Sequence, residues 1–173
     1  MRFLTTLLLS FISLFAVSQE QLKVLQTVRD VARTIPDHTG ETYENTLSAI
    51  CLTESSAGTN VIGDFRKGIV ITKASLGVLQ IQVATARFVS NRVDSLSWLQ
   101  DLSDAQIANK LLSDVELSAR IAANYLVILQ KARKKYFSMV SGYNGGKVNH
   151  PYYSRVMKNM QLVKELVKNG AIT

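Results

Sequence analysis

Glu54 is the residue of this chain that is best placed to act as a proton donor. It lies three residues after Cys51 and four after Ile50 in a helical pattern, so its side chain should project beside core residues. A carboxyl held against apolar groups loses hydration, which raises its pKa toward the range where a general acid stays protonated. Because most glutamates at helix ends are surface charges, this position alone is weak evidence for catalysis.

Histidine and cysteine patterns give little sign of a metal or nucleophilic site. His38 and His150 are far apart, Cys51 is the only cysteine, and no His-x-x-x-His or Cys-x-x-Cys spacing occurs. Cys51 could pair with either histidine as a nucleophile, but it falls on the apolar stripe of its helix and is better read as a buried core thiol. We therefore expect no metal and no cofactor.

Four short segments supply a context for Glu54. In chain order they are Glu-Ser at 54–55, Ser-Leu-Gly-Val-Leu-Gln-Ile at 75–81, Gly-Tyr-Asn-Gly-Gly at 142–146 and Tyr-Tyr-Ser-Arg-Val at 152–156. Together they resemble the soluble lytic transglycosylase (SLT) family, whose pattern is Glu-Ser, Gly-Leu-Met-Gln-Ile, Ala-Tyr-Asn-Ala-Gly and Tyr-Val-x-x-Val. Each motif alone is weak, but four in order over roughly residues 47–163 make a strong signal. The resemblance implies a mainly α, lysozyme-like fold of the goose type.

The resemblance also implies roles for individual residues. Glu54 matches the catalytic acid/base, and Ser55 matches the adjacent hydroxyl that helps to shape the site. Gly77 lets backbone approach the glycan, and Tyr152 matches a tyrosine near the acid. The residues implied to bind substrate are Ser55, Ser75, Gly77, Gln80, Tyr143, Asn144 and Tyr152. For the two tyrosines, a core ring remains the alternative.

Several positions depart from the family pattern. Val78 stands for Leu and Leu79 for Met, and both changes conserve volume approximately. Gly142 and Gly145 stand for the two alanines, which loosens that loop without removing its polar groups. The loop at 57–74 has no firm counterpart, and differences in specificity are expected there.

The expected reaction is cleavage of peptidoglycan between N-acetylmuramic acid and N-acetylglucosamine. Glycoside hydrolysis usually needs two carboxylates, whereas a lytic transglycosylase works with one and closes a 1,6-anhydro ring on the muramic acid. Only Glu54 lies in a motif, and Asp64 is the nearby carboxylate that could act second. We expect a transglycosylase. A lysozyme-type hydrolase and a non-catalytic peptidoglycan-docking component remain alternatives.

The first eighteen residues predict export. Met1 and Arg2 precede an apolar run at 3–17, and small residues occupy the −3 and −1 positions before Gln19. A retained anchor is the alternative, but about 15 apolar residues fall short of the ~20 that span a bilayer. We expect a signal peptide at 1–18, a catalytic domain at 19–173, and a location in the periplasm or outside the cell.

Predicted export decides which partners the positive charge of the chain would suit. The chain carries a net charge of +7, and the loss of Arg2 with the leader would leave +6. Outside the inner membrane this charge favours anionic envelope polymers over nucleic acid as partners. The expected partner is the peptidoglycan strand, with an envelope-spanning secretion, conjugation, flagellar or phage-related assembly as an open addition. No membrane span is expected after cleavage of the leader.

Apolar periodicity predicts the helices that must position these residues. One stripe runs over 22–35 and stops at Pro36, a second runs over 43–54, and a third begins near Gln82. Ser113 is predicted to open the clearest helix through a capping box with Glu116. The buried stripe of that helix comprises Leu117, Ile121, Tyr125, Ile128 and Leu129.

The remaining signals are a shorter capped start, one candidate strand and a last helix. Ser103 begins a capping box, and residues 69–72 are apolar and β-branched enough for a short strand. Pro151 fits the first turn of a helix that ends at Gly170. The predicted fold is therefore mainly α, with at most a small β-hairpin.

Overall fold

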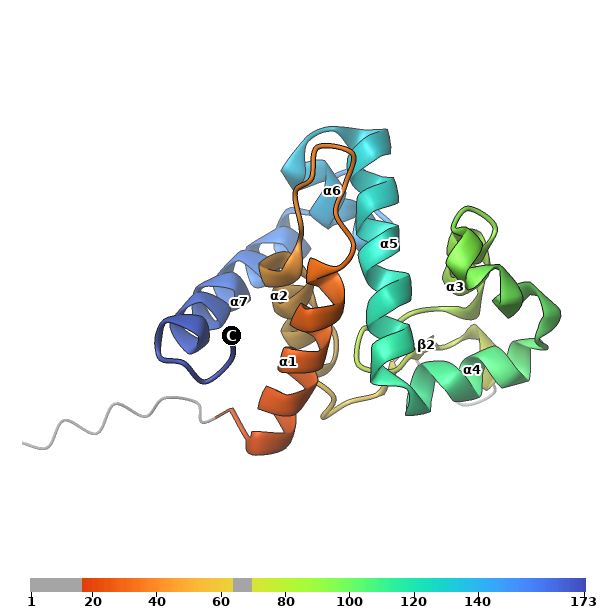
Figure 1. Cartoon of the computed structure of the whole chain (residues 1–173), viewed down its shortest axis with the longest axis horizontal. Coiled ribbons are helices and arrows are strands. Elements are labelled where there is room, and N and C mark those ends of the chain that lie inside the picture. Colours follow the sequence, from red (N-terminus) through yellow and green to blue (C-terminus); the bar gives the residue numbers. More distant parts are fainter. Residues whose placement is uncertain (1–16, 64–69) are drawn as a thin grey trace, which may run out of the picture.

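The computed structural model describes residues 17–63 and 70–173 (Figure 1). Within these ranges the chain is mainly α, as predicted, and its one sheet is a two-stranded antiparallel pair. The α-helices are α1 (Gln19–Arg33), α2 (Glu44–Ser55), α3 (Val83–Ser90), α4 (Asp104–Ser113), α5 (Val115–Arg133), α6 (Tyr136–Tyr143) and α7 (His150–Lys168). The short elements are β1 (Ile62–Gly63), β2 (Ser75–Leu76) and the 3-10 helices η1 (Ile71–Lys73) and η2 (Asp94–Asp101).

Helix α5 connects two groups of elements. On one side it packs against α1 and α6, and α2 packs in turn against both α1 and α7. On the other side it contacts α3 and α4, and η2 covers α3 (Figure 1). The core side chains are almost all aliphatic, with Leu25, Leu47, Ile50 and Ile121 fully buried. This core holds the end of α2, which carries Glu54, against the start of α7.

Several predicted helix ends are confirmed. Ser103 caps α4 with a reciprocal capping box to Gln106, and Pro151 lies in the first turn of α7. Gly170 adopts a positive φ of 70° just after α7, and the following N–H of Ala171 donates to the carbonyl of Leu166 at 2.9 Å. Only glycine adopts this left-handed conformation at little cost, which explains the stop.

The predicted start of α5 was wrong by one residue. Ser113 is the last residue of α4, and its hydroxyl donates back to the carbonyl of Asn109 at 2.9 Å. Asp114 caps α5 instead, because its carboxylate accepts the N–H of Leu117 at 2.9 Å. Two cap-forming residues stand side by side here, and the bend between α4 and α5 selects the second.

The predicted strand at 69–72 was also wrong. Ile71 and Thr72 belong to η1, closed by a 2.8 Å bond from the N–H of Lys73 to the carbonyl of Val70; Ile69 lies outside the described residues. The strand pair forms between β1 and β2, with Ile62 opposite Leu76. β-branched residues favour strands only where a partner strand is available. Here the partner of β1 is β2, which follows the apolar segment in the chain.

Most of the predicted leader and all of Asp64 lie outside the described residues. Ser18, the last residue of the predicted leader, forms a capping box with Gln21 at the start of α1. Across residues 17–63 and 70–173, none of the helices combines the length and the hydropathy needed to cross a membrane.

Candidate active site

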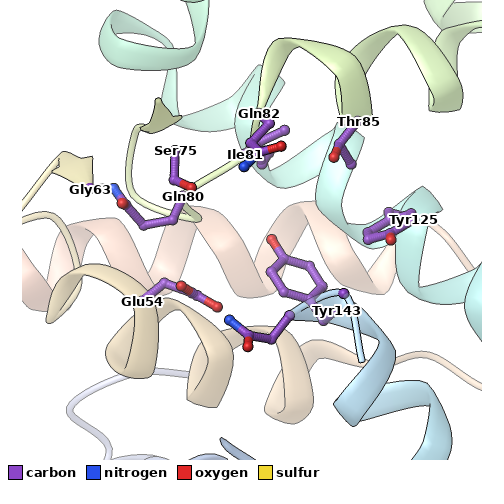
Figure 2. A pocket seen from close by; sticks show the side chains of 11 residues that line it. Glu54, Gly63, Ser75, Gln80, Ile81, Gln82, Thr85, Tyr125 and Tyr143 are labelled. Atoms are coloured by element: carbon purple, nitrogen blue, oxygen red, sulfur yellow. The ribbon is translucent and has the colours of Figure 1, made fainter. Parts of the chain in front are cut away.

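A pocket of about 440 Å³ opens beside the last turn of α2 (Figure 2). The side chains of Glu54, Gln80 and Tyr143 converge on it from three separate segments. Its described lining comprises Glu54, Gly63, Ser75, Gln80, Ile81, Gln82, Thr85, Tyr125, Tyr143, Asn144 and Gly145. Of the predicted site residues, Glu54, Ser75, Gln80, Tyr143 and Asn144 therefore line one pocket, while Ser55, Gly77 and Tyr152 lie behind its wall.

Tyr152 holds the carboxylate of Glu54 from behind. Its hydroxyl donates to Oε1 of Glu54 at 2.6 Å, and its side chain is 1 % exposed. Burial, followed by the nearby charge of Glu54, raises the pKa of Tyr152, so the phenol keeps its proton and acts as the donor. The N–H of Tyr152 is capped by the side chain of Asn149 at 3.1 Å, which ties this contact to the first turn of α7.

Tyr143 lines the pocket from the end of α6. Its hydroxyl donates to the carbonyl of Leu79 at 2.9 Å, so the hydroxyl is engaged by the protein. Burial and the charge of Glu54 raise the pKa of Tyr143 well above its usual range, and the ring contacts that of Tyr125 with centroids 5.7 Å apart. The next residue, Asn144, accepts a 3.0 Å hydrogen bond from the amide of Asn149.

The turn at 76–81 forms the opposite wall. Leu76 and Ile81 pair across it, and Gln80 adopts a positive φ of 49° while its amide donates to the carbonyl of Gly77 at 2.9 Å. Gly77 has a φ of 74°, and a Cβ added there would overlap the carbonyl oxygen of Leu111. Glycine is required at 77 because the turn packs against the end of α4.

Ser55 fastens the end of α2 to this turn. It is 1 % exposed, its hydroxyl donates to the carbonyl of Val78 at 2.6 Å, and it accepts the N–H of Gly58 at 2.8 Å. Cys51, one turn earlier, is fully buried and contacts the same carbonyl at 3.5 Å. Burial raises the pKa of the Cys51 thiol to about 12, which confirms its prediction as a core thiol.

Comparison with known families agrees with this geometry. A family model described as "Transglycosylase SLT domain" matches residues 37–162. The chain belongs to the SLT transglycosylase family. The matched range includes Glu54, the turn at 76–81, Tyr143 and Tyr152, so the resemblance inferred from the four motifs is confirmed. Neither the curated proteins nor the solved structures yielded a match.

Membership in the SLT family indicates the general class of activity of the chain. The family activity is that of peptidoglycan lytic transglycosylases, so the chain has a transglycosylase-type enzyme domain whose substrate is peptidoglycan. Within residues 17–63 and 70–173, no group of three or more His, Cys, Asp or Glu side chains lies close enough to hold a metal ion. Glu54 is the one carboxylate among the described residues that line the pocket of this SLT domain.

The motifs did not reveal the whole lining of the SLT pocket. Gln82 and Thr85 come from the start of α3, and Tyr125 comes from the middle of α5. Apolar periodicity predicted that Tyr125 belongs to a buried stripe, whereas its side chain is half-buried and faces the pocket. An aromatic residue with a polar tip inside an aliphatic stripe was the signal that could have identified it.

Proposed function

We propose that this domain cleaves the β-1,4 bond between N-acetylmuramic acid and N-acetylglucosamine and leaves 1,6-anhydromuramic ends. The observation that carries the proposal is the hydrogen bond between Tyr152 and Glu54 at the wall of a polar pocket, with Glu54 as the one carboxylate among the described lining residues. A single acid/base suffices for a lytic transglycosylase but is unusual for a hydrolase.

The proposed reaction uses Glu54 twice. Its protonated carboxyl first gives its proton to the bridging oxygen, the bond from that oxygen to C1 of muramic acid breaks, and N-acetylglucosamine leaves as the alcohol. The N-acetyl group of the muramic acid stabilises the cation at C1. Glu54, now a carboxylate, takes the proton of the 6-hydroxyl while O6 bonds to C1. This step closes the anhydro ring, consumes no water and returns Glu54 to its protonated form.

The other predicted residues divide into two groups in this proposal. Ser75, Gln80, Tyr143 and Asn144 contact the glycan from the pocket wall, because hydroxyl, amide and aromatic groups suit sugar hydroxyls, N-acetyl groups and ring faces. Ser55, Gly77 and Tyr152 act indirectly, since their burial and internal hydrogen bonds support positioning of the wall and of Glu54.

Export remains part of the proposal. Peptidoglycan lies outside the inner membrane, and the positive start and apolar run at 1–17 are what a secretory leader needs. We place the mature protein, residues 19–173, in the periplasm or outside the cell, with a wall-opening assembly as an additional partner. Amino-terminal sequencing of the protein recovered from the periplasm tests the cleavage after Ser18.

Digestion of purified peptidoglycan tests the chemistry. Residues 19–173 are compared with the Glu54→Gln variant, and with Glu165→Gln as the matched control, because Glu165 is exposed on α7 outside the pocket. Mass spectrometry identifies the new ends. Anhydro ends from the parent and control proteins, reduced at least about 100-fold by Glu54→Gln, support the proposal. Reducing ends would indicate a hydrolase with Asp64 as second carboxylate, and binding without cleavage would indicate a docking protein.

A further inference from the structure

One stripe of α3 continues the pocket wall outward. Gln82 and Thr85 line the pocket, and Phe88 and Arg92 follow Thr85 by three and seven residues, which places them on the same helix face. The chain remains coiled just past α3, since the N–H of Arg92 donates to the carbonyl of Val89 at 2.9 Å. At the helical rise of 1.5 Å per residue, Arg92, just past the end of α3, lies about 10 Å from Thr85 in the direction of the helix axis.

Aromatic contacts connect this stripe to the pocket. The ring of Phe88 meets that of Tyr125 edge to face, with centroids 6.1 Å apart, and Tyr125 contacts Tyr143 beside Glu54. Phe88 is 37 % exposed, so part of its ring is accessible at the surface. The row of rings therefore runs without a break from the proposed catalytic centre to an exposed aromatic ring.

Arg92 is held on this exposed ring. Its guanidinium carbon lies 3.8 Å from the centroid of Phe88, and Nη1 donates to the carbonyl of Phe88 at 2.9 Å. Stacking and one hydrogen bond orient the planar group while the side chain stays exposed. Phe88 thus acts as a platform for a cation at the rim of the cleft.

The charge of Arg92 is not neutralised by the ion pairs of the described residues, which involve Arg33, Arg87, Arg120 and Lys23. Arg87, in the last turn of α3, gives the contrast, because it binds Asp104 at 2.7 Å and also donates to the carbonyl of Leu102. Arg87 has a structural role that uses its donors. Arg92 keeps most of its donors for a partner from solution.

We propose that Arg92, stacked on Phe88, is an outer subsite of the cleft that binds a carboxylate carried by the glycan strand. The inference rests on the proposed function, because it takes the strand to run along α3 from the pocket. A guanidinium fork matches a carboxylate with two parallel hydrogen bonds, and stacking lowers the cost of fixing it. The strand carries such groups on its stem peptides, and on the lactyl ether of muramic acid where a peptide has been removed.

Binding measurements on the Glu54→Gln protein test the subsite without turnover. The probes are soluble peptide-bearing strands, the same strands with their carboxylates converted to amides, and strands whose peptides have been removed. Arg92→Gln should weaken binding of the first probe about tenfold, the range for one charged hydrogen-bonded contact, and leave the amidated probe unaffected. Weakening on the peptide-bearing strands alone would identify the stem-peptide carboxylates as the source, and weakening on the peptide-free strands alone would identify the lactyl carboxylate; either result supports the subsite.

Two further variants separate the subsite from general effects. Phe88→Leu removes the platform and should weaken binding of the peptide-bearing probe in the same direction. Lys158→Gln removes an exposed cation on α7 and should change none of the three affinities. Equal weakening of charged and amidated strands by Arg92→Gln, or no weakening at all, overturns the subsite. If the parent protein fails to cleave peptidoglycan while the Arg92 effect persists, the proposed reaction is wrong and the subsite stands.

Discussion

The hydroxyl of Tyr152 donates a 2.6 Å hydrogen bond to Oε1 of Glu54, although the two residues are separated by 98 positions in the chain. The bond joins the last turn of α2 to the first turn of α7, and α2 and α7 are packed closely together. It orients the carboxylate toward the pocket from a buried position. Any reaction that uses Glu54 therefore depends on how these two helices meet.

Removal of this hydroxyl tests its role in positioning. Tyr152→Phe should lower kcat about 10- to 100-fold with little change in KM, because a hydrogen bond to a charged group contributes roughly 1.5–3 kcal/mol. Initial rates of anhydro-end formation measure the effect. Tyr153→Phe is the matched control, since Tyr153 is the next residue of α7 and its side chain makes only ring contacts with Tyr136 and Phe137 among the interactions described. Unchanged kcat in Tyr152→Phe would show that the bond is dispensable.

Gly142 and Arg133 form a pair that should respond jointly to substitution. Arg133 donates to the carbonyl of Gly146 at 2.6 Å, and a Cβ at position 142 would lie 2.7 Å from its guanidinium carbon. Gly142→Ala should displace Arg133 and destabilise the fold by about 1 kcal/mol, as measured by urea unfolding. In the Arg133→Ala background the same change should cost nothing or stabilise the helix. Additive effects of the two substitutions would contradict the pairing.

Gly77 combines left-handed backbone with a close contact. Gly77→Ala should destabilise the fold by about 3 kcal/mol or more. A side chain there would overlap the backbone oxygen of Leu111, and alanine would also have to adopt an unfavourable positive φ. Gly40→Ala is the control, since Gly40 has a similar φ of 87° and nothing within 4 Å of an added Cβ. Its cost should be only about 1–2 kcal/mol. Equal losses in the free energy of unfolding for Gly77→Ala and Gly40→Ala would mean that the end of α4 moves away from the added side chain at no energetic cost.

Asp37 should make stability fall in acid. Its carboxylate accepts bonds from the Thr39 hydroxyl at 2.6 Å, the Tyr43 hydroxyl at 2.7 Å and the N–H of Glu41 at 3.1 Å, and these hold the pKa of Asp37 well below its ordinary value. A depressed pKa in the folded state contributes stability above the unfolded value of about 3.9 and loses it as pH falls toward the folded value.

Asp37→Asn should therefore lower stability at pH 7 and flatten its decline between about pH 4 and pH 2. Urea midpoints measured across this range test the expectation. Asp30→Asn, on the exposed side of α1, should leave the slope nearly unchanged, because its ion pair with Arg33 is long and solvent-exposed. Parallel curves of urea midpoint against pH for the parent protein and Asp37→Asn would contradict the linkage between protonation of Asp37 and stability.

Cys51 should be unreactive in the folded protein. Its side chain is fully buried and burial raises the pKa of its thiol to about 12, so the thiolate that reacts with alkylating reagents is scarce below that pH. Labelling with a maleimide at pH 8 should be slow without denaturant and fast in concentrated urea. Rapid labelling under native conditions would show that the core around α2 opens readily.

Much of the fold could be predicted from local signals. Apolar periodicity located α1, α2, α3 and α5 but not α6, the reciprocal cap at Ser103 and the stop at Gly170 were correct, and Cys51 was correctly assigned to the core. Both errors arose where the surroundings overrode a local preference: the junction of α4 and α5 places the cap at Asp114 and not at Ser113, and β1 pairs with β2 and not with residues 70–72.

The sequence by itself determined the family of the protein and the position of Glu54, since motif order and spacing are properties of the chain alone. Only the tertiary structure decided which motif residues face the pocket. Ser55 and Tyr152 lie behind its wall, and Tyr125, which belongs to no motif, is part of the lining. The physical reason is that a period of 3.6 residues gives the direction of a side chain relative to its own helix, while the packing of α2, α5 and α7 decides what lies in that direction.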